Sequence, residues 1–198
     1  MPRVKYLCAG CNNGWMSNLE TAVRPLMGAM INDLAVLLDR DQQQLIATWA
    51  LKTAMVFECM NDTGEWFYSQ ADRRHLLTIL SPPAKDTIIW LGRHQGSRQA
   101  FAEGKKLSGG KPIQNVALGE GSVMTLALGH LAIQVFTMKR RPEHQAIPIT
   151  LNIKPGKWDA SLIQIWPTVP AFRWPPRLSF DGAGLDRLSN RFTAPPSP

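Results

Sequence analysis

Two cysteines near the start of the chain have the spacing that metal sites and redox sites share. Cys8 and Cys11 form a C-x-x-C turn, and Gly10 between them permits a tight bend. Two thiols at this spacing can supply half of a tetrahedral zinc site, which takes four ligands. Zinc is therefore the cofactor that the sequence predicts.

Three interpretations of the Cys8 and Cys11 pair stay open. In the first, the zinc site is completed by Cys59 with a histidine, by a second copy of the chain in a homodimer, or by a partner chain. In the second, the thiols stay reduced in a turn that no longer binds metal. In the third, they form a redox pair, for which a helix start follows as required but no βαβ pattern precedes.

The fourteen residues from Val4 to Ser17, VKYLCAGCNNGWMS, resemble the second cysteine knuckle of HNH endonucleases. The segment WALKTA, which begins at Trp49, is similar to one that follows the knuckle in bacterial HNH-like proteins. In that family, two C-x-x-C pairs share a structural zinc, and a strand with the catalytic Asp-His pair lies between them. The resemblance implies that Cys8 and Cys11 are the second pair and that Asn12 stands near the catalytic metal.

The family's first cysteine pair and its Asp-His strand have no counterpart in this chain, because only seven residues precede Cys8. Phosphodiester hydrolysis in that fold needs a His that activates water and a metal that stabilises the leaving oxygen. The histidines lie far downstream without a matching motif: His75, His94, His130 and His144. We therefore expect no catalytic residue here. The resemblance implies a nucleic-acid-associated protein related to HNH nucleases, truncated or split and inactive alone; the alternative is a non-catalytic protein-interaction module.

The charge of the chain agrees with an acidic partner. It has 22 Lys and Arg against 15 Asp and Glu, a net charge of +7, which favours nucleic acid as the partner. Basic residues near the ends of predicted strands form the candidate nucleic-acid-binding set, although solvated loops would explain the same residues. This set is Arg93, Arg98, Lys105, Lys106, Lys111, Lys139, Arg140 and Arg141.

Composition restricts the class of protein. Apolar residues make up 44% of the chain and charged residues 19%, which excludes a disordered chain, and no apolar run is long enough to predict a membrane span. No secretory signal is apparent after Met1, and three cysteines form no disulfide pattern. The sequence thus predicts a cytoplasmic protein with reduced thiols.

Helices are predicted in the first part of the chain. A capping box of Ser17 and Glu20 predicts a helix that begins near Asn18, and Pro25 either kinks it or starts a second one. A central helix is expected over residues 42–60, capped by Asp39 or Asp41 and packed on several sides. A further helix, capped by Ser69, is expected to end near Leu80.

Extended structure is predicted from residue 87 onward. Apolar and β-branched runs at 87–91, 121–128, 131–138, 147–153 and 162–166 indicate an antiparallel meander, with a hairpin turn at Gly129-His130. Prolines become frequent after Trp166, so we expect a tail that wraps as extended chain, with one short helix over residues 183–190.

The predicted fold class is α+β, with N-terminal helices packed on a C-terminal antiparallel sheet and a Pro-rich wrapping tail. We expect a single domain over residues 1–198. Its parts are a zinc-knuckle-like remnant at 1–17, a helical part at 18–80, a mainly β part at 86–192 and a flexible tail at 193–198.

Overall fold

The structure is a computed structural model, and it describes residues 8–60, 66–109, 119–142 and 161–192. The helices are α1 (Ala9–Asn13), α2 (Trp15–Ile31), α3 (Arg40–Glu58), α4 (Gln70–Ile79) and α5 (Gly182–Asn190). The strands are β1 (Val36–Leu38), β2 (Thr87–His94), β3 (Ala100–Gly109), β4 (Gly119–Leu128), β5 (Leu131–Arg140), β6 (Leu162–Trp166), β7 (Phe172–Trp174) and β8 (Ser179–Phe180).

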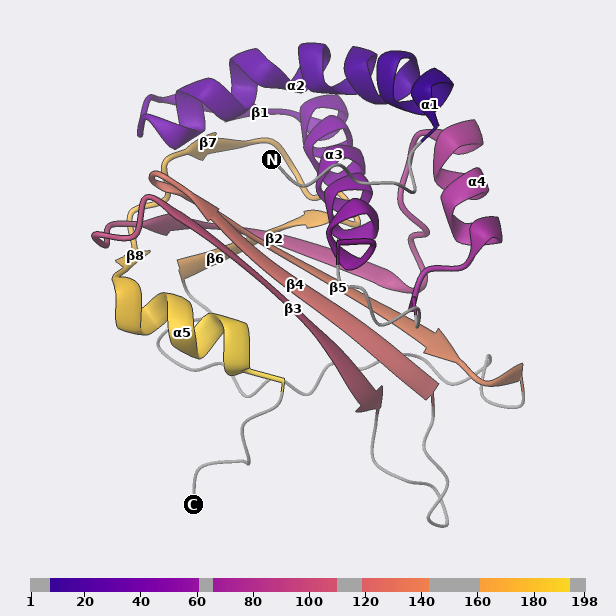
Figure 1. Ribbon diagram of the computed structural model, residues 1–198. Helices are drawn as coiled ribbons and strands as arrows, with labels where there is room; N and C mark the ends of the chain where they lie inside the picture. Colours follow the sequence, from indigo (N-terminus) through magenta and orange to yellow (C-terminus); the bar gives the residue numbers. More distant parts are fainter. Residues whose placement is uncertain (1–7, 61–65, 110–118, 143–160, 193–198) are drawn as a thin grey trace.

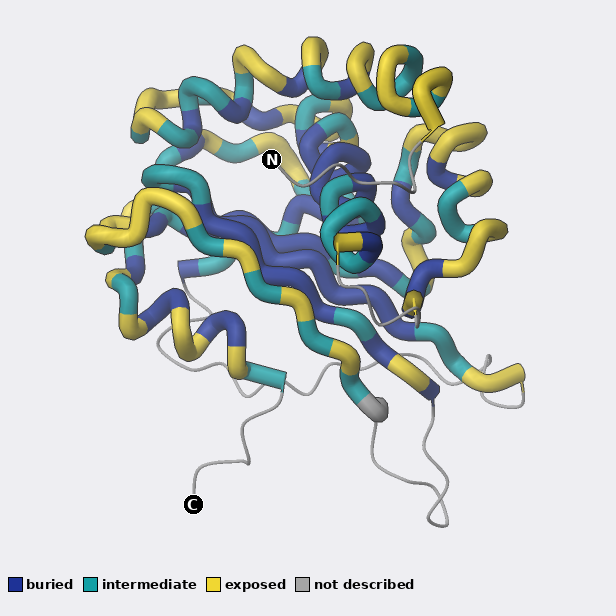
Figure 2. The backbone as a smooth tube through the Cα atoms, viewed as in Figure 1, coloured by how far each residue is buried: buried dark blue, intermediate teal, exposed yellow. Residues whose placement is uncertain are grey.

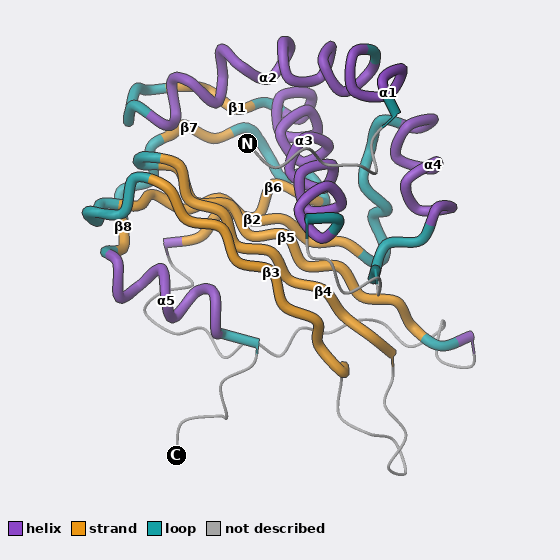
Figure 3. The backbone as a smooth tube through the Cα atoms, in the orientation of Figure 1, coloured by secondary structure: helices purple, strands orange, loops and turns teal. Residues whose placement is uncertain are grey.

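The fold is α+β, as the sequence predicts. The main sheet has the strand order β3-β4-β5-β2-β6; these neighbours are all antiparallel, and β8 adds a short parallel pairing to β2. Helices α1 to α4 lie on one side of the sheet and α5 on the other (Figures 1 and 3). No helix in the described ranges is both long and apolar enough to cross a membrane.

Two helix caps lie where the sequence predicts them, at Ser69 and at Asp39, the first of two candidates; α3 begins at Arg40, two residues before the expected start. The Asp39 side chain accepts from the N–H of Gln42, and the Gln42 side chain accepts in return from the N–H of Asp39, so α3 begins with a complete capping box. Ser69 and Asp72 form the same arrangement at the start of α4. These local bonds satisfy backbone donors that have no partner within the helix.

The predicted capping box of Ser17 and Glu20 is wrong. Helix α2 begins at Trp15, three residues before the expected start at Asn18, so Ser17 lies inside it. The start is set by Gly14, which joins α1 to α2 so closely that a Cβ would lie 2.5 Å from the Gly10 carbonyl oxygen. Pro25 lies inside α2, which continues to Ile31 without a second start.

The sheet is buried on both faces, because successive side chains of a strand point to opposite sides. On β5, Ile133 and Val135 belong to the main core with residues of α2 and α3, such as Met30 and Ile46. Ala132 points the other way and packs with Leu185 and Leu188 of α5. Figure 2 shows the resulting buried band along the central strands.

The C-terminal segment returns to the helical part of the chain. After β6, strand β7 pairs antiparallel with β1, and Trp174 of β7 is almost fully buried in the main core. Helix α5 follows at Gly182–Asn190, where the sequence predicts a short helix. The expected strand at 147–153 and the expected flexible tail at 193–198 lie outside the described residues.

Strand β3 is absent from the sequence prediction, which placed Lys105 and Lys106 in a basic stretch without assigning them to a strand. The two lysines lie within this ten-residue edge strand, paired with Val123 and Ser122 of β4. Neither Gly nor Lys favours strands, so local propensity gives little indication of it. The extended conformation of β3 therefore depends on its pairing with β4 and not on the local sequence.

Candidate functional site

The cysteine pair lies on α1 and on the residue that precedes it. Cys8 is the N-cap residue, and its Sγ accepts a hydrogen bond from the backbone N–H of Cys11 at 3.2 Å. Cys8 is exposed and Cys11 is partly buried. The pair therefore presents one thiol to solvent and one to the protein.

The two thiols differ in acidity. The pKa of Cys8 is lowered, first by a hydrogen bond from the Cys11 thiol and then by the Cys11 backbone N–H. The pKa of Cys11 is raised, first by its hydrogen bond to Cys8 and then by burial, while the Trp15 side chain opposes this shift. Cys8 is thus the thiol that ionises first, and a thiolate is the form that binds metal or attacks an electrophile.

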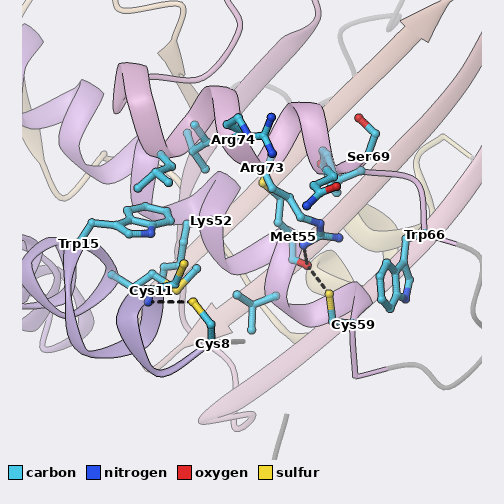
Figure 4. Close-up of a pocket in the computed structure, with 16 residues that line it drawn as sticks. Cys8, Cys11, Trp15, Lys52, Met55, Cys59, Trp66, Ser69, Arg73 and Arg74 are labelled. Carbon is cyan, nitrogen blue, oxygen red and sulfur yellow. Dashed lines mark hydrogen bonds between the residues drawn. The ribbon is translucent and has the colours of Figure 1, made fainter. Parts of the chain in front are cut away.

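All three cysteines of the chain line one cavity of about 670 Å³ between α1, α2, α3 and α4 (Figure 4). Cys59 stands apart from Cys8 and Cys11 in this view, and it donates a hydrogen bond to the Met55 carbonyl oxygen at 3.3 Å. Burial raises the pKa of the Cys59 thiol.

Within the described ranges, no group of three or more His, Cys, Asp or Glu side chains is placed to hold a metal ion. Cys59 thus shares the cavity with Cys8 and Cys11 but does not join them in such a group. Asn12 is exposed on α1, and its side-chain amide contacts that of Asn13 at 3.5 Å. The residues described here supply two zinc ligands, and a closed site needs two more.

A carboxylate that the sequence analysis did not single out holds one wall of the cavity. Glu58 on α3 accepts hydrogen bonds from the backbone N–H groups of Phe67 and Tyr68 at 2.9 and 3.0 Å. It also forms an ion pair with Arg73 of α4 at 2.5 Å. Burial raises the pKa of Glu58, although these donors oppose the shift. Nothing in the spacing of these residues along the sequence indicates this contact.

Most of the candidate nucleic-acid-binding residues are engaged in ion pairs. Five of the eight contact a carboxylate within the described part of the chain: Arg93 with Asp33, Arg98 with Asp186, Lys105 with Glu103, Lys139 with Asp72, and Arg140 with Asp86. Lys106 and Arg141 are exposed, and Lys111 lies outside the described residues. Pairing with acids lowers the positive potential that these residues present to a phosphate.

These basic residues also fall on different faces. Lys105 reaches Asn190 of α5 at 2.5 Å, whereas Lys139 contacts Asp72 of α4 on the opposite side of the sheet. Lys106 follows Lys105 in an extended strand, so it points away from α5. The structure therefore divides the set instead of gathering it on one surface.

Comparison with models of known protein families gives no match, and comparisons with curated proteins and with solved structures give none either. The likeness of the Val4 to Ser17 segment to an HNH knuckle thus stays a prediction from the sequence.

Proposed function

We propose that this protein is the zinc-binding, non-catalytic component of an HNH-related assembly that acts on nucleic acid. In this proposal, Cys8 and Cys11 supply half of a zinc site, and a partner chain or a second copy supplies the remaining ligands. The observation that carries the proposal is the arrangement of the pair: Cys8 caps α1, Cys11 lies one turn into it, hydrogen bonds join the two residues, and Cys8 is exposed.

Accessibility and acidity both support a metal site shared between chains. A ligand from another molecule can approach Cys8 without displacing the core, because α1 has no buried residue. The lowered pKa of Cys8 favours the thiolate that zinc requires. Reduced, free cysteines also agree with the proposed cytoplasmic location.

Zinc stoichiometry measured together with molecular mass tests this proposal. The protein is loaded with zinc, freed of excess metal, and analysed for metal content and mass in solution. One zinc per two chains in a dimer is the result expected for a homodimeric site. One zinc per monomer that is lost in Cys59→Ser would contradict a shared site.

A Cys8→Ser, Cys11→Ser double variant is the control for specific metal binding, and Cys59→Ser is its matched comparison. The proposal expects zinc binding to disappear in the double variant and to persist in Cys59→Ser. If neither the protein alone nor the protein with candidate partner chains retains zinc, the zinc-binding role is wrong.

The nucleic-acid part of the proposal is supported by the net charge of +7. Because five of the basic residues are already paired with acids, we expect weak binding without sequence preference, with log affinity that falls linearly with log salt. Changing exposed Lys106 and Arg141 to Gln should flatten this dependence. The same change at Arg24 and Arg40, exposed on α2 and α3, is the control for net charge.

One observation favours the alternative, a protein-interaction module. Trp66 and Leu77 both line the cavity, and each is 40% exposed. Exposed apolar residues grouped in this way mark protein contact sites. Zinc-independent association with a partner, together with no binding to nucleic acid at low salt, would favour this function.

A further inference from the structure

The cavity beside the cysteine pair has the size of a small-molecule site. Its volume is about 670 Å³, within the roughly 300–1,000 Å³ that such sites occupy. Apolar side chains from three helices form much of its lining: Trp15 of α2, Met55 and Val56 of α3, and Leu76 and Leu77 of α4. Trp15 and Trp66 stand at opposite ends of the cavity in Figure 4.

Among the described residues that line the cavity, the charged side chains are all cations. They are Lys52, Arg73 and Arg74, and none of the described lining residues is Asp or Glu. Lys52 is paired with Glu20, and Arg73 with Glu58, by carboxylates that are not part of the lining. Their charges are largely compensated, so they favour an anion only weakly.

Arg74 differs from the other two cations. It is exposed on α4, and among the described residues no carboxylate forms an ion pair with it. Its guanidinium offers several N–H donors in the planar arrangement that fits a carboxylate. An apolar cavity with such a cation at its side is complementary to a molecule with an apolar body and one negative end.

We propose that this cavity binds a small organic anion, a carboxylate with an unbranched or aromatic apolar body. The apolar body lies against Met55, Leu76 and Leu77, where it leaves water, and the carboxylate contacts Arg74. This binding does not depend on zinc at Cys8 and Cys11, so it is separate from the function proposed above.

Isothermal titration with decanoate tests the proposal, with decylammonium as the probe of opposite charge. We expect one decanoate per chain, with a Kd at or below about 1 mM, and at least about fivefold weaker binding of decylammonium. Equal binding of the two probes would overturn the assignment of an anion. Failure of decanoate to bind at all would overturn the site.

A pair of variants with equal charge change locates the anion. Arg74→Gln removes the cation beside the cavity, and Arg24→Gln removes an exposed cation on α2 that does not line it. Arg74→Gln is expected to weaken decanoate about three- to fivefold, and Arg24→Gln to leave its affinity unchanged. Equal effects of the two changes would show only a response to net charge and would overturn the contact with Arg74.

A second pair of variants locates the apolar body. Leu77→Asn changes a residue that lines the cavity, and Ile79→Asn changes an exposed residue of the same helix that does not. Both side chains are substantially exposed, so both variants are expected to fold, which circular dichroism verifies. Loss of decanoate affinity in Leu77→Asn alone supports the proposal, and equal affinities in the two variants would show that the ligand binds elsewhere.

Discussion

Lys52 of α3 forms an ion pair with Glu20 of α2, and this contact joins the two helices at the edge of the cavity. The two side chains differ in exposure: that of Lys52 is 9% exposed, whereas that of Glu20 is 45% exposed. The ammonium group also lies 5.3 Å from the centre of the Trp49 ring. A largely buried cation is therefore neutralised by a carboxylate that remains in contact with water.

Replacing Glu20 should lower the free energy of unfolding more than replacing Lys52. In Glu20→Gln the ammonium group loses its counter-charge, and we expect the free energy of unfolding to fall by about 1–2 kcal/mol. Lys52→Met replaces the cation with an apolar chain of similar length and should change stability by less than about 1 kcal/mol. Urea denaturation of both variants measures this difference, and a greater loss in Lys52→Met would contradict it.

Cys8 should react with iodoacetamide at lower pH than an ordinary thiol, because hydrogen bonds from Cys11 lower its pKa below the usual 9.0. Cys11→Ala removes the thiol donor but keeps the backbone N–H. The pH at which the alkylation rate of Cys8 is half-maximal should therefore rise in this variant, but it should stay below the usual pKa of a cysteine thiol. Mass spectrometry of the modified peptide in the presence of a chelator measures the rates. Cys59→Ser is the control and should leave the midpoint unchanged.

The Cys8→Ser, Cys11→Ser double variant should remain folded when the protein is alone. Helix α1 contributes no buried residue, so the free energy of unfolding should fall by less than about 1 kcal/mol. Thermal unfolding with and without a chelator checks this. A large fall in melting temperature would mean that the chain closes a structural metal site by itself.

Two Gly→Ala changes should have opposite effects on stability. Gly129 has φ +52° in the turn between β4 and β5, and a Cβ there would lie 2.6 Å from the Ile31 carbonyl oxygen, so Ala should cost about 1–3 kcal/mol. Gly28 lies inside α2 with no atom within 4 Å of a Cβ, so Ala should add about 0.5–1 kcal/mol. Thermal denaturation of the two variants shows whether each change lowers or raises the stability.

The isolated chain should not cleave DNA. Supercoiled plasmid incubated with the protein and Mg²⁺, Mn²⁺ or Ni²⁺ should remain supercoiled. The His that activates water in HNH nucleases has no predicted counterpart in this sequence. Gel electrophoresis shows the result. Metal-dependent nicking that copurifies with the protein and disappears in Asn12→Ala would reverse this prediction.

The sequence predicts best those elements whose position is set by residues close together in the chain. The helix starts at Asp39 and Ser69 are set by side chains within three residues, so their positions can be read from the sequence. The turn at Gly129 is likewise local. The start of α2 was not predicted, because it is set at Gly14 and not at Ser17. Glu20, which suggested a capping box with Ser17, pairs instead with Lys52, thirty-two residues away.

The candidate site was predicted only at its cysteine pair. Cys8 and Cys11 are close in space because they are close in sequence, whereas the cavity exists because α4 packs beside α1 and α3. That packing includes the burial of Leu76 in the main core and the contact between Glu58 and Arg73, whose spacing of fifteen residues follows neither helix nor strand periodicity. Cys59, Trp66 and Arg74 join the cavity for the same reason.

The order of strands in the sheet constrains how the chain can fold while it is being synthesised. Strand β2 lies between β5 and β6, both of which are made later, and its first residue pairs with Thr137. The β3-β4-β5 meander can form from neighbouring segments. Until it has formed, both edges of β2 lack a strand to pair with. Contacts so distant in sequence form slowly. A nascent chain that has not yet released β5 therefore carries an unpaired apolar strand, and a chaperone that shields this strand would raise the yield of folded protein.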